Sequence, residues 1–227
     1  RKKISMLLCL LFIIPNLIIM AEARSFGKWE TKFGFAGKVG SAAYLDDGAV
    51  MEGFGGAWYS KPVKKQAGIK FCLHKKVNKY NFIVALMNKP NVGWNLNGKE
   101  SQGIVLQIRS WSNEEGIVAD VFKVTGKGER GVEKIGQLNS RIAPMNTNHF
   151  VAFYKNSDKW TIALDGGQIV ECGQSDFGGN EMYVAAGATY NENDDYAKAM
   201  DLKMSVQAVY TDDEMPSAYY GDGDMAG

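Results

Sequence analysis

Residues 158–171, DKWTIALDGGQIVE, contain the strongest fold signal in the chain. Trp160, Ile162 and Leu164 alternate with smaller or polar residues, a period-two pattern typical of a strand with one buried face. Asp165 then opens a D-G-G sequence, in which the glycines tolerate positive φ, and an extended run resumes after it. The stretch therefore predicts a β-hairpin, with Asp165 as a turn residue rather than a catalytic group.

The same period-two pattern recurs along the chain between clusters of Gly, Asn, Asp and Pro. Short strands at this spacing, without alternating helices, predict an all-β fold made of two antiparallel sheets in a single β-sandwich domain. The expected strands are 32–36, 68–74, 81–87, 103–109, 117–124, 149–155, 159–164, 168–172, 181–187 and 202–210.

The first 23 residues differ in composition from the rest. Three basic residues precede an apolar run of about 15 residues and the triplet Ala21-Glu22-Ala23, the layout of a secretory signal peptide. The run is shorter than the ~20 residues of a membrane span. We therefore expect a signal peptide at 1–23, a β-sandwich domain at 24–212 and a flexible C-terminal tail at 213–227. The mature protein is expected to be secreted and extracellular, without a membrane span.

The net charge and the length of the chain exclude some classes of function. Without residues 1–23 the chain of 227 residues retains 204, with 23 basic and 24 acidic side chains, so its net charge is −1. This balance provides no electrostatic attraction to nucleic acid, which we do not expect as a partner. The length is sufficient for one domain with a sizeable core.

Two cysteines, Cys72 and Cys172, follow the expected signal peptide. In a secreted protein an even pair is a disulfide candidate, and closing a loop of about 100 residues would contribute ~4.7 kcal/mol in the chain-entropy model. The alternative is two separate thiols, and the sequence does not decide between them.

Four segments carry a family resemblance. They are GIKFCLH (68–74), QGIVLQIRS (102–110), HFVAFYKNSDKWTIALDGGQIV (149–170) and DLKMSVQAVY (201–210). In this order they resemble the concanavalin A-like lectin/glucanase superfamily of jelly-roll sandwiches, which includes laminin-G-like modules. The resemblance covers roughly residues 27–212. It implies a secreted jelly roll whose sheet face or rim loops bind carbohydrate, sometimes with calcium, and which in enzyme branches cleaves polysaccharide.

The enzyme branches make specific demands on the sequence. The glucanase branch carries Glu-x-Asp-x-Glu on one strand, where alternate residues share a face and can flank a glycosidic bond. This chain has no such triplet, and its acidic clusters at 46–47 and 191–196 fit solvated turns. A lyase would use a His or Tyr base with Arg or Gln opposite a uronate. The residues available for that role are His74, His149, Tyr80, Arg109 and Gln107, which strand alternation alone does not bring together.

Calcium is the only cofactor for which the sequence offers ligands. Residues 191–195, Asn-Glu-Asn-Asp-Asp, are hard oxygen donors of the kind that Ca²⁺ prefers. They lack the spaced D-x-D-x-D-G pattern of a calcium loop, so a polar loop without metal is the preferred interpretation.

Aromatic residues flanked by amides provide the best indication of sugar binding. Pyranose rings stack on Trp and Tyr, while Asn, Gln, Asp and Arg side chains bind the hydroxyl groups. The alternative for each Trp is a place in the core, which we expect for Trp160. The candidate ligand-binding residues are Trp94, Asn95 and Asn97 in segment 88–101, Trp111 and Asn113 in segment 110–115, and Trp58 and Tyr59 after the glycine-rich GFGGA.

Together these features predict a secreted, non-catalytic, lectin-like β-sandwich that binds a glycan or polysaccharide through aromatic rim loops. One alternative is a polysaccharide-degrading enzyme of the same fold, either a glycoside hydrolase or a polysaccharide lyase. Another is a structural or adhesive surface protein, which could contact its partner by strand addition at a sheet edge.

Overall fold

The computed structural model describes residues 35–40, 43–45, 48–52, 55–74, 81–90, 102–110, 115–127, 131–173, 177, 179–189 and 203–216. In this part of the chain nearly all regular structure is β-strand, with a 3-10 turn at Asp212–Glu214. The strands are β1 (Phe35–Gly40), β2 (Ala43–Leu45), β3 (Gly48–Glu52), β4 (Gly55–Tyr59), β5 (Gln66–Leu73), β6 (Asn81–Met87), β7 (Gln102–Ser110), β8 (Ile117–Thr125), β9 (Val132–Ser140), β10 (Asn148–Asn156), β11 (Lys159–Leu164), β12 (Ile169–Gly173), β13 (Tyr183–Thr189) and β14 (Lys203–Thr211).

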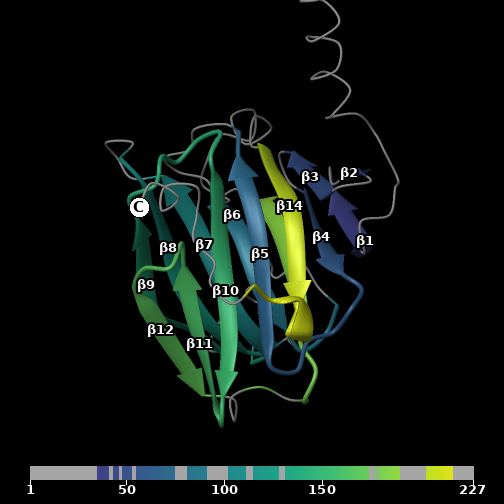
Figure 1. The fold of residues 1–227 in the computed structure, drawn as a ribbon. Coiled ribbons are helices and arrows are strands. Elements are labelled where there is room, and N and C mark those ends of the chain that lie inside the picture. The colour runs from purple at the N-terminus through teal and green to yellow at the C-terminus, as the bar shows by residue number, and fades with distance from the viewer. Residues whose placement is uncertain are drawn as a thin grey trace, which may run out of the picture.

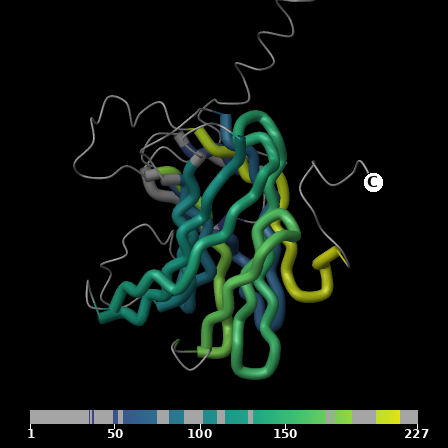
Figure 2. Tube along the Cα trace, turned by 90° about the vertical axis from the view of Figure 1, so that its left-hand side faces the viewer, coloured from purple at the N-terminus to yellow at the C-terminus, as the bar shows by residue number. Residues whose placement is uncertain are grey.

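The strands form two seven-stranded antiparallel sheets that pack face to face (Figures 1 and 2). The front sheet, toward the viewer in Figure 1, has the order β12-β11-β10-β5-β14-β3-β2. The back sheet has the order β1-β4-β13-β6-β7-β8-β9. Several pairs of strands that are consecutive in sequence, such as β4 and β5, lie in different sheets, which is how a jelly roll is wound. The predicted antiparallel β-sandwich is confirmed.

The core lies between the sheets and is made by alternate residues of each strand. Phe71 on β5, Phe82 on β6, and Trp160 and Ile162 on β11 are at most 1% exposed and belong to one apolar cluster. Burying such a side chain contributes roughly 1.5–3 kcal/mol each, so this layer is the main source of stability. The core position expected for Trp160 is confirmed.

Four strands, β2, β3, β4 and β9, were not predicted from the pattern. In β4, Gly55, Gly56 and Ala57 are all buried, so no polar residue marks an outward face. In β9 a β-bulge shifts the register between two residue pairs, Val121–Gly136 and Phe122–Lys134, leaving Ile135 as the extra residue. Because a bulge changes which residues share a face, the alternation of buried and exposed residues is interrupted there, and the strand is not predicted from it.

The predicted hairpin turn at Asp165 is present between β11 and β12. Asp165 and Gly166 both have positive φ, 51° and 70°, as the central residues of a type I′ turn require. The turn is closed by a hydrogen bond from the Gly167 N–H to the Leu164 carbonyl oxygen, at 3.0 Å. Asp165 is nevertheless buried, which a solvated turn residue would not be.

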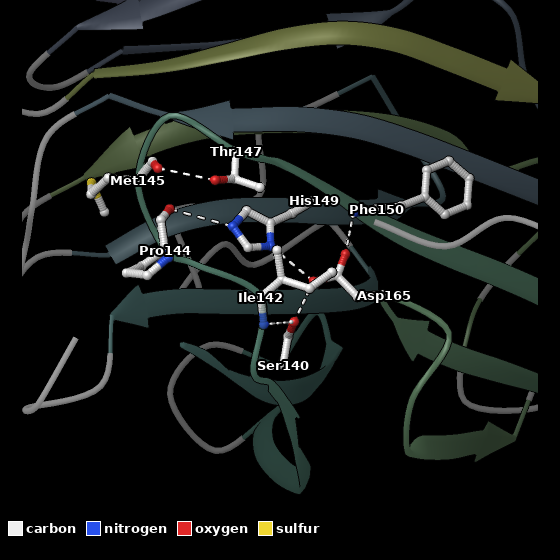
Figure 3. Close-up of polar contacts among 8 residues, drawn as sticks. All are labelled: Ser140, Ile142, Pro144, Met145, Thr147, His149, Phe150 and Asp165. Carbon is white, nitrogen blue, oxygen red and sulfur yellow. Dashed lines mark hydrogen bonds and ion pairs between the residues drawn. The ribbon is translucent and has the colours of Figure 1, made fainter. Parts of the chain in front are cut away.

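The Asp165 carboxylate is the centre of a buried polar network (Figure 3). Its Oδ2 accepts hydrogen bonds from the Ser140 hydroxyl at 2.5 Å and from His149 Nδ1 at 2.8 Å, while Oδ1 accepts the Phe150 N–H at 2.6 Å. The second ring nitrogen, His149 Nε2, faces the Pro144 carbonyl oxygen at 3.3 Å. Ser140 ends β9 in the back sheet, whereas His149 and Phe150 lie on β10 in the front sheet. One carboxylate therefore joins the two sheets.

Asp212 fastens the end of β14 to the segment before β5. Its carboxylate accepts the backbone N–H groups of Lys64, Lys65 and Gln66 at 2.8–3.2 Å, and in the same turn Glu214 pairs with Lys61 at 2.9 Å. These contacts extend past the expected start of the tail at residue 213, while 217–227 lie outside the described residues. Burial alone raises the pKa of the Asp212 carboxyl, but the backbone hydrogen bonds outweigh it and hold the pKa below its usual value.

We predict that Asp165→Asn lowers the free energy of unfolding by about 3 kcal/mol, the upper end of the range for a hydrogen bond to a charged group. Asn tolerates positive φ, so the loss reports on the network rather than on the turn. Asp158→Asn, in the exposed turn between β10 and β11, is the matched control and should change stability by less than about 0.5 kcal/mol. Urea unfolding measures both, and equal effects of the two variants would contradict the assigned role of the network.

We also predict that Asp212→Asn makes the melting temperature fall less steeply at low pH. A carboxyl whose pKa is lower in the folded state stabilises the protein above its unfolded pKa, near 4, and loses that contribution as the pH falls through its folded pKa. The melting temperature of the wild type should therefore fall more steeply below pH 4 than that of Asp212→Asn. Asp213→Asn is the control, since Asp213 is the exposed neighbour in the same turn. A parallel fall in wild type and Asp212→Asn would refute the prediction.

Candidate functional site

Most of the predicted ligand-binding residues fall in segments that the structure does not describe. Trp94, Asn95 and Asn97 lie outside the described residues, as do Trp111 and Asn113. The attachment points of their segments are described, however. Segment 88–101 connects β6 to β7, and segment 110–115 leads from β7 to β8. The two segments therefore join the back sheet at opposite ends of β7, about 27 Å apart for nine residues of strand.

Trp58 and Tyr59 are adjacent on β4 and point to opposite faces of the back sheet. Trp58 is half-buried and packs on the face that is turned away from the front sheet, here called the outer face. Tyr59 packs against the core and meets the Phe35 ring edge to face, with centroids 5.7 Å apart. Burial, reinforced by the negative charge of Glu214, raises the pKa of the Tyr59 hydroxyl. The two candidate residues Trp58 and Tyr59 therefore lie on opposite faces of the back sheet.

Part of the outer face is apolar, and Trp58 lies in this part. Gly37 on β1 pairs with Trp58, and a Cβ atom at this glycine would lie 1.8 Å from Trp58 Cζ2. The indole ring therefore rests directly on the backbone of β1, which only glycine permits. Along the same row, Ala185, Ala85 and Val105 on the neighbouring strands belong to a second apolar cluster and are fully buried.

The other part of the outer face is polar and is centred on Asp120 of β8. Asp120 Oδ1 accepts hydrogen bonds from Gln137 Nε2 at 2.6 Å and Lys134 Nζ at 2.8 Å, and Oδ2 lies 3.5 Å from Arg109 Nη2. Gln107 is the cross-strand partner of Asp120 on β7 and shares this face. The four residues around Asp120 therefore present cationic and amide groups close to the apolar part of the face.

The bulge in β9 is what brings Lys134 and Gln137 together. Residues three apart in a regular strand point to opposite faces. The extra residue, Ile135, restores them to the same face, and both reach the same carboxylate oxygen. Bulges often re-aim side chains near functional sites.

Asp120 is held in its ionised form. Burial on its own raises the pKa of this carboxyl, but the hydrogen bonds from Lys134 and Gln137 and the charge of Arg109 outweigh burial and hold the pKa below its usual value. A general acid for glycosidic cleavage needs the opposite shift, and both hydrolase geometries need a second carboxylate. Among the described residues of the outer face, Asp120 is the only carboxylate. The described part of this face can therefore stack against and hydrogen-bond a ligand, but it does not contain an acid/base pair.

The residues considered for a lyase are not brought together. Arg109 and Gln107 lie on the outer face of the back sheet, whereas His149 is buried between the sheets and His74 follows β5 in the front sheet. Tyr80 lies outside the described residues. His74 Nε2 is 2.6 Å from the Ser205 hydroxyl, and burial lowers the pKa of the imidazole.

The buried Ser140, His149 and Asp165 are not arranged for nucleophilic catalysis. In a hydrolytic triad the serine hydroxyl bonds to the histidine and the aspartate bonds to the other ring nitrogen. Here serine and histidine both donate to Asp165, and the second histidine nitrogen faces a backbone carbonyl (Figure 3). Their role is structural.

The disulfide considered between Cys72 and Cys172 is not formed, and both residues are thiols. They lie on β5 and β12, which are separated in the front sheet by β10 and β11. Three strand spacings amount to about 14 Å, whereas a disulfide needs Cα atoms within about 7 Å.

Neither a metal site nor a membrane helix is found within the described ranges. No group of three or more His, Cys, Asp or Glu side chains there is placed to hold a metal, and the calcium candidates 191–195 lie outside those ranges. No helix in this part of the chain has the length and apolar character needed to span a bilayer.

No protein-family model and no curated protein sequence matches the chain. Solved structures do match, at low sequence identity. A Crh5 transglycosylase in complex with NAG aligns with a TM-score of 0.55 and 13% identity, covering 78% of this chain and 76% of that one. The exoplasmic/lumenal domain of VIP36 in its Ca²⁺/Man3GlcNAc-bound form aligns with a TM-score of 0.53 and 9% identity, covering 80% and 86%. A family 16 endo-glucanase from Bacteroides ovatus, in complex with G4G3G-2F-DNP, aligns with a TM-score of 0.51 and 10% identity, covering 78% and 84%. The chain therefore has the concanavalin A-like jelly-roll fold, as its sequence resemblance predicted.

Proposed function

We propose that the protein is a non-catalytic carbohydrate-binding β-sandwich and that its binding surface is the outer face of the back sheet. The observation that carries the proposal is the placement of Trp58, which lies over Gly37 on the same face as the polar groups around Asp120. Aromatic rings bind the C–H face of a pyranose, and amide and charged side chains bind its hydroxyl groups. Trp58 on β4 and Asp120 on β8 are four strand spacings apart, about 19 Å, so the two groups would contact different units of one polysaccharide chain.

The partial exposure of Trp58 supports the same proposal. In the row that runs through Gly37, Ala185 and Ala85, the two alanines are fully buried, whereas Trp58 is partly exposed. A sugar ring that reaches this row therefore contacts the indole. The segments that contain Trp94 and Trp111 join the two ends of this sheet, and we propose that they extend the surface along β7.

The fold neighbours agree with a carbohydrate ligand. Among them are a transglycosylase in complex with NAG, an endo-glucanase in complex with G4G3G-2F-DNP and an exoplasmic/lumenal domain bound to Man3GlcNAc. Because a shared fold does not determine function, this agreement supports the proposal without identifying the sugar. The signal-like layout of residues 1–23 leads us to propose an extracellular site of action.

A polysaccharide-degrading enzyme is the second candidate, because the fold neighbours include a transglycosylase and an endo-glucanase as well as a domain bound to Man3GlcNAc. The described outer face offers Asp120 alone, already bonded to Lys134 and Gln137. An enzyme would need its remaining acid or base from outside the described residues. Release of reducing ends or unsaturated products from a panel of neutral and uronate polysaccharides would favour this candidate.

We predict that Trp58→Ala weakens binding to a polysaccharide ligand about tenfold, or ~1.4 kcal/mol, the scale of a lost aromatic contact. Gly37→Ala should also weaken binding, because its methyl group displaces the indole while every polar group is kept. Tyr154→Ala on β10 of the front sheet removes a half-buried aromatic residue elsewhere and should leave binding unchanged.

Binding is measured by glycan array and polysaccharide pull-down, followed by titration of the ligand found, and thermal unfolding checks that each variant is folded. The wild type should bind at least one polysaccharide. Absence of binding on array and pull-down at high protein concentration would overturn the proposed function. Equal affinities for wild type, Trp58→Ala and Gly37→Ala would place the ligand elsewhere.

A further inference from the structure

The guanidinium of Arg109 on the outer face is incompletely hydrogen-bonded within the described residues. Its contact with Asp120 is a single 3.5 Å approach of Nη2 to Oδ2, rather than the two short parallel bonds of a bidentate pair. The other terminal nitrogen, Nη1, is buried and has no hydrogen-bond partner among the described residues. The side chain as a whole is 34% exposed, so the guanidinium is not sealed inside the protein.

The charges of the described residues on this part of the face do not balance. Arg109 and Lys134 both approach Asp120, so within the described ranges two positive charges share one negative charge. Oδ1 of Asp120 is already occupied by Lys134 and Gln137. An arginine has five N–H donors and a lysine has three, so several charged donors remain available to a ligand.

Neutral donors and acceptors surround this cationic pair. Gln107 is the cross-strand partner of Asp120, and Asn139 shares a row with Arg109 through Val118. These amides are suited to sugar hydroxyl groups, while the guanidinium is suited to a planar or tetrahedral oxyanion. The cluster therefore combines hydroxyl recognition with one position for a negative charge.

The buried Nη1 is out of reach of a ligand, so a ligand oxygen would bond to the donors on the exposed third of the Arg109 side chain. A neutral hydroxyl satisfies the hydrogen bond but not the excess charge. A carboxylate or sulfate oxygen satisfies both, and a charge-assisted bond is roughly twice as strong as a neutral one.

We infer that the outer face selects acidic polysaccharides, with Arg109 binding the oxyanion of a uronate or sulfate group and Lys134 assisting it. This inference rests on the proposed function, because it names the ligand class of the same surface. Trp58 would then supply affinity for the sugar ring, and Arg109 would supply the preference for the acidic one.

Two ligand pairs that differ mainly in charge test the inference. Polygalacturonate is compared with its methyl ester, and dextran sulfate with dextran, by titration at low and high salt. We expect the wild type to bind the acidic member of at least one pair about tenfold or more tightly, with the preference reduced at high salt. The first pair reports a uronate carboxylate and the second a sulfate ester.

Arg109→Gln should abolish the preference for the acidic member, and Arg109→Lys should restore only part of it because the planar fork is lost. Arg141→Gln is the matched control, since it removes the same charge from an exposed arginine just after β9. Lys134→Gln is a second variant on a half-exposed side chain and should reduce the preference less than Arg109→Gln. Thermal unfolding verifies that each variant is folded.

The two proposals fail in different ways. Equal binding of charged and neutral members, or equal effects of Arg109→Gln and Arg141→Gln, would overturn the acidic preference and leave carbohydrate binding intact. An acidic preference that Arg109→Gln and Lys134→Gln both retain would place the anion elsewhere and overturn the assignment. No binding to any polysaccharide would overturn the proposed function and this inference together.

Discussion

The carboxylate of Asp165 is the contact on which the geometry of the sandwich depends. It accepts hydrogen bonds from Ser140 at the end of β9 and from His149 and Phe150 on β10, and so ties one edge of the back sheet to the front sheet. Packing between apolar layers is non-directional and would tolerate a small slide, whereas three hydrogen bonds to one buried carboxylate do not. Because β9 also carries Lys134 and Gln137, the network positions part of the candidate binding face from the opposite side of the strand.

Much of the fold follows from local pattern, as residues 158–171 illustrate. Trp160, Ile162 and Leu164 alternate because one face is buried, and the D-G pair takes the positive φ values of the turn. What local pattern does not contain is the identity of the carboxylate's partners. Ser140 is 25 residues away, and its contact with Asp165 exists only once the two sheets are paired. The turn could therefore be predicted, while its second role as a link between the sheets could not.

The candidate site was less predictable than the fold for a related reason. Trp58 was a candidate from its residue type, but the segment resembled a flexible loop, and in a loop Tyr59 could point the same way. In a strand it cannot, and Tyr59 enters the core instead. Asp120 and Lys134 were not predicted at all, because a site spread over β7, β8 and β9 depends on long-range register. Arg109 was considered only as part of a lyase. It contacts Asp120 on β8, a predicted strand, and shares that carboxylate with Lys134 on β9, a strand that was not predicted.

The bulge at Ile135 makes the charge of the outer face depend on how β9 pairs with β8. If β9 kept all its residues but paired as a regular ladder, Lys134 would turn inward and Glu133 outward. The local balance of two positive charges to one negative would become one positive to two negative, without any change in the charged residues. Deleting Ile135, in contrast, would leave Lys134 opposite Phe122 and on the outer face. Substitutions that suppress the bulge are therefore a route by which relatives of this protein could acquire opposite charge selectivity on an otherwise unchanged sandwich.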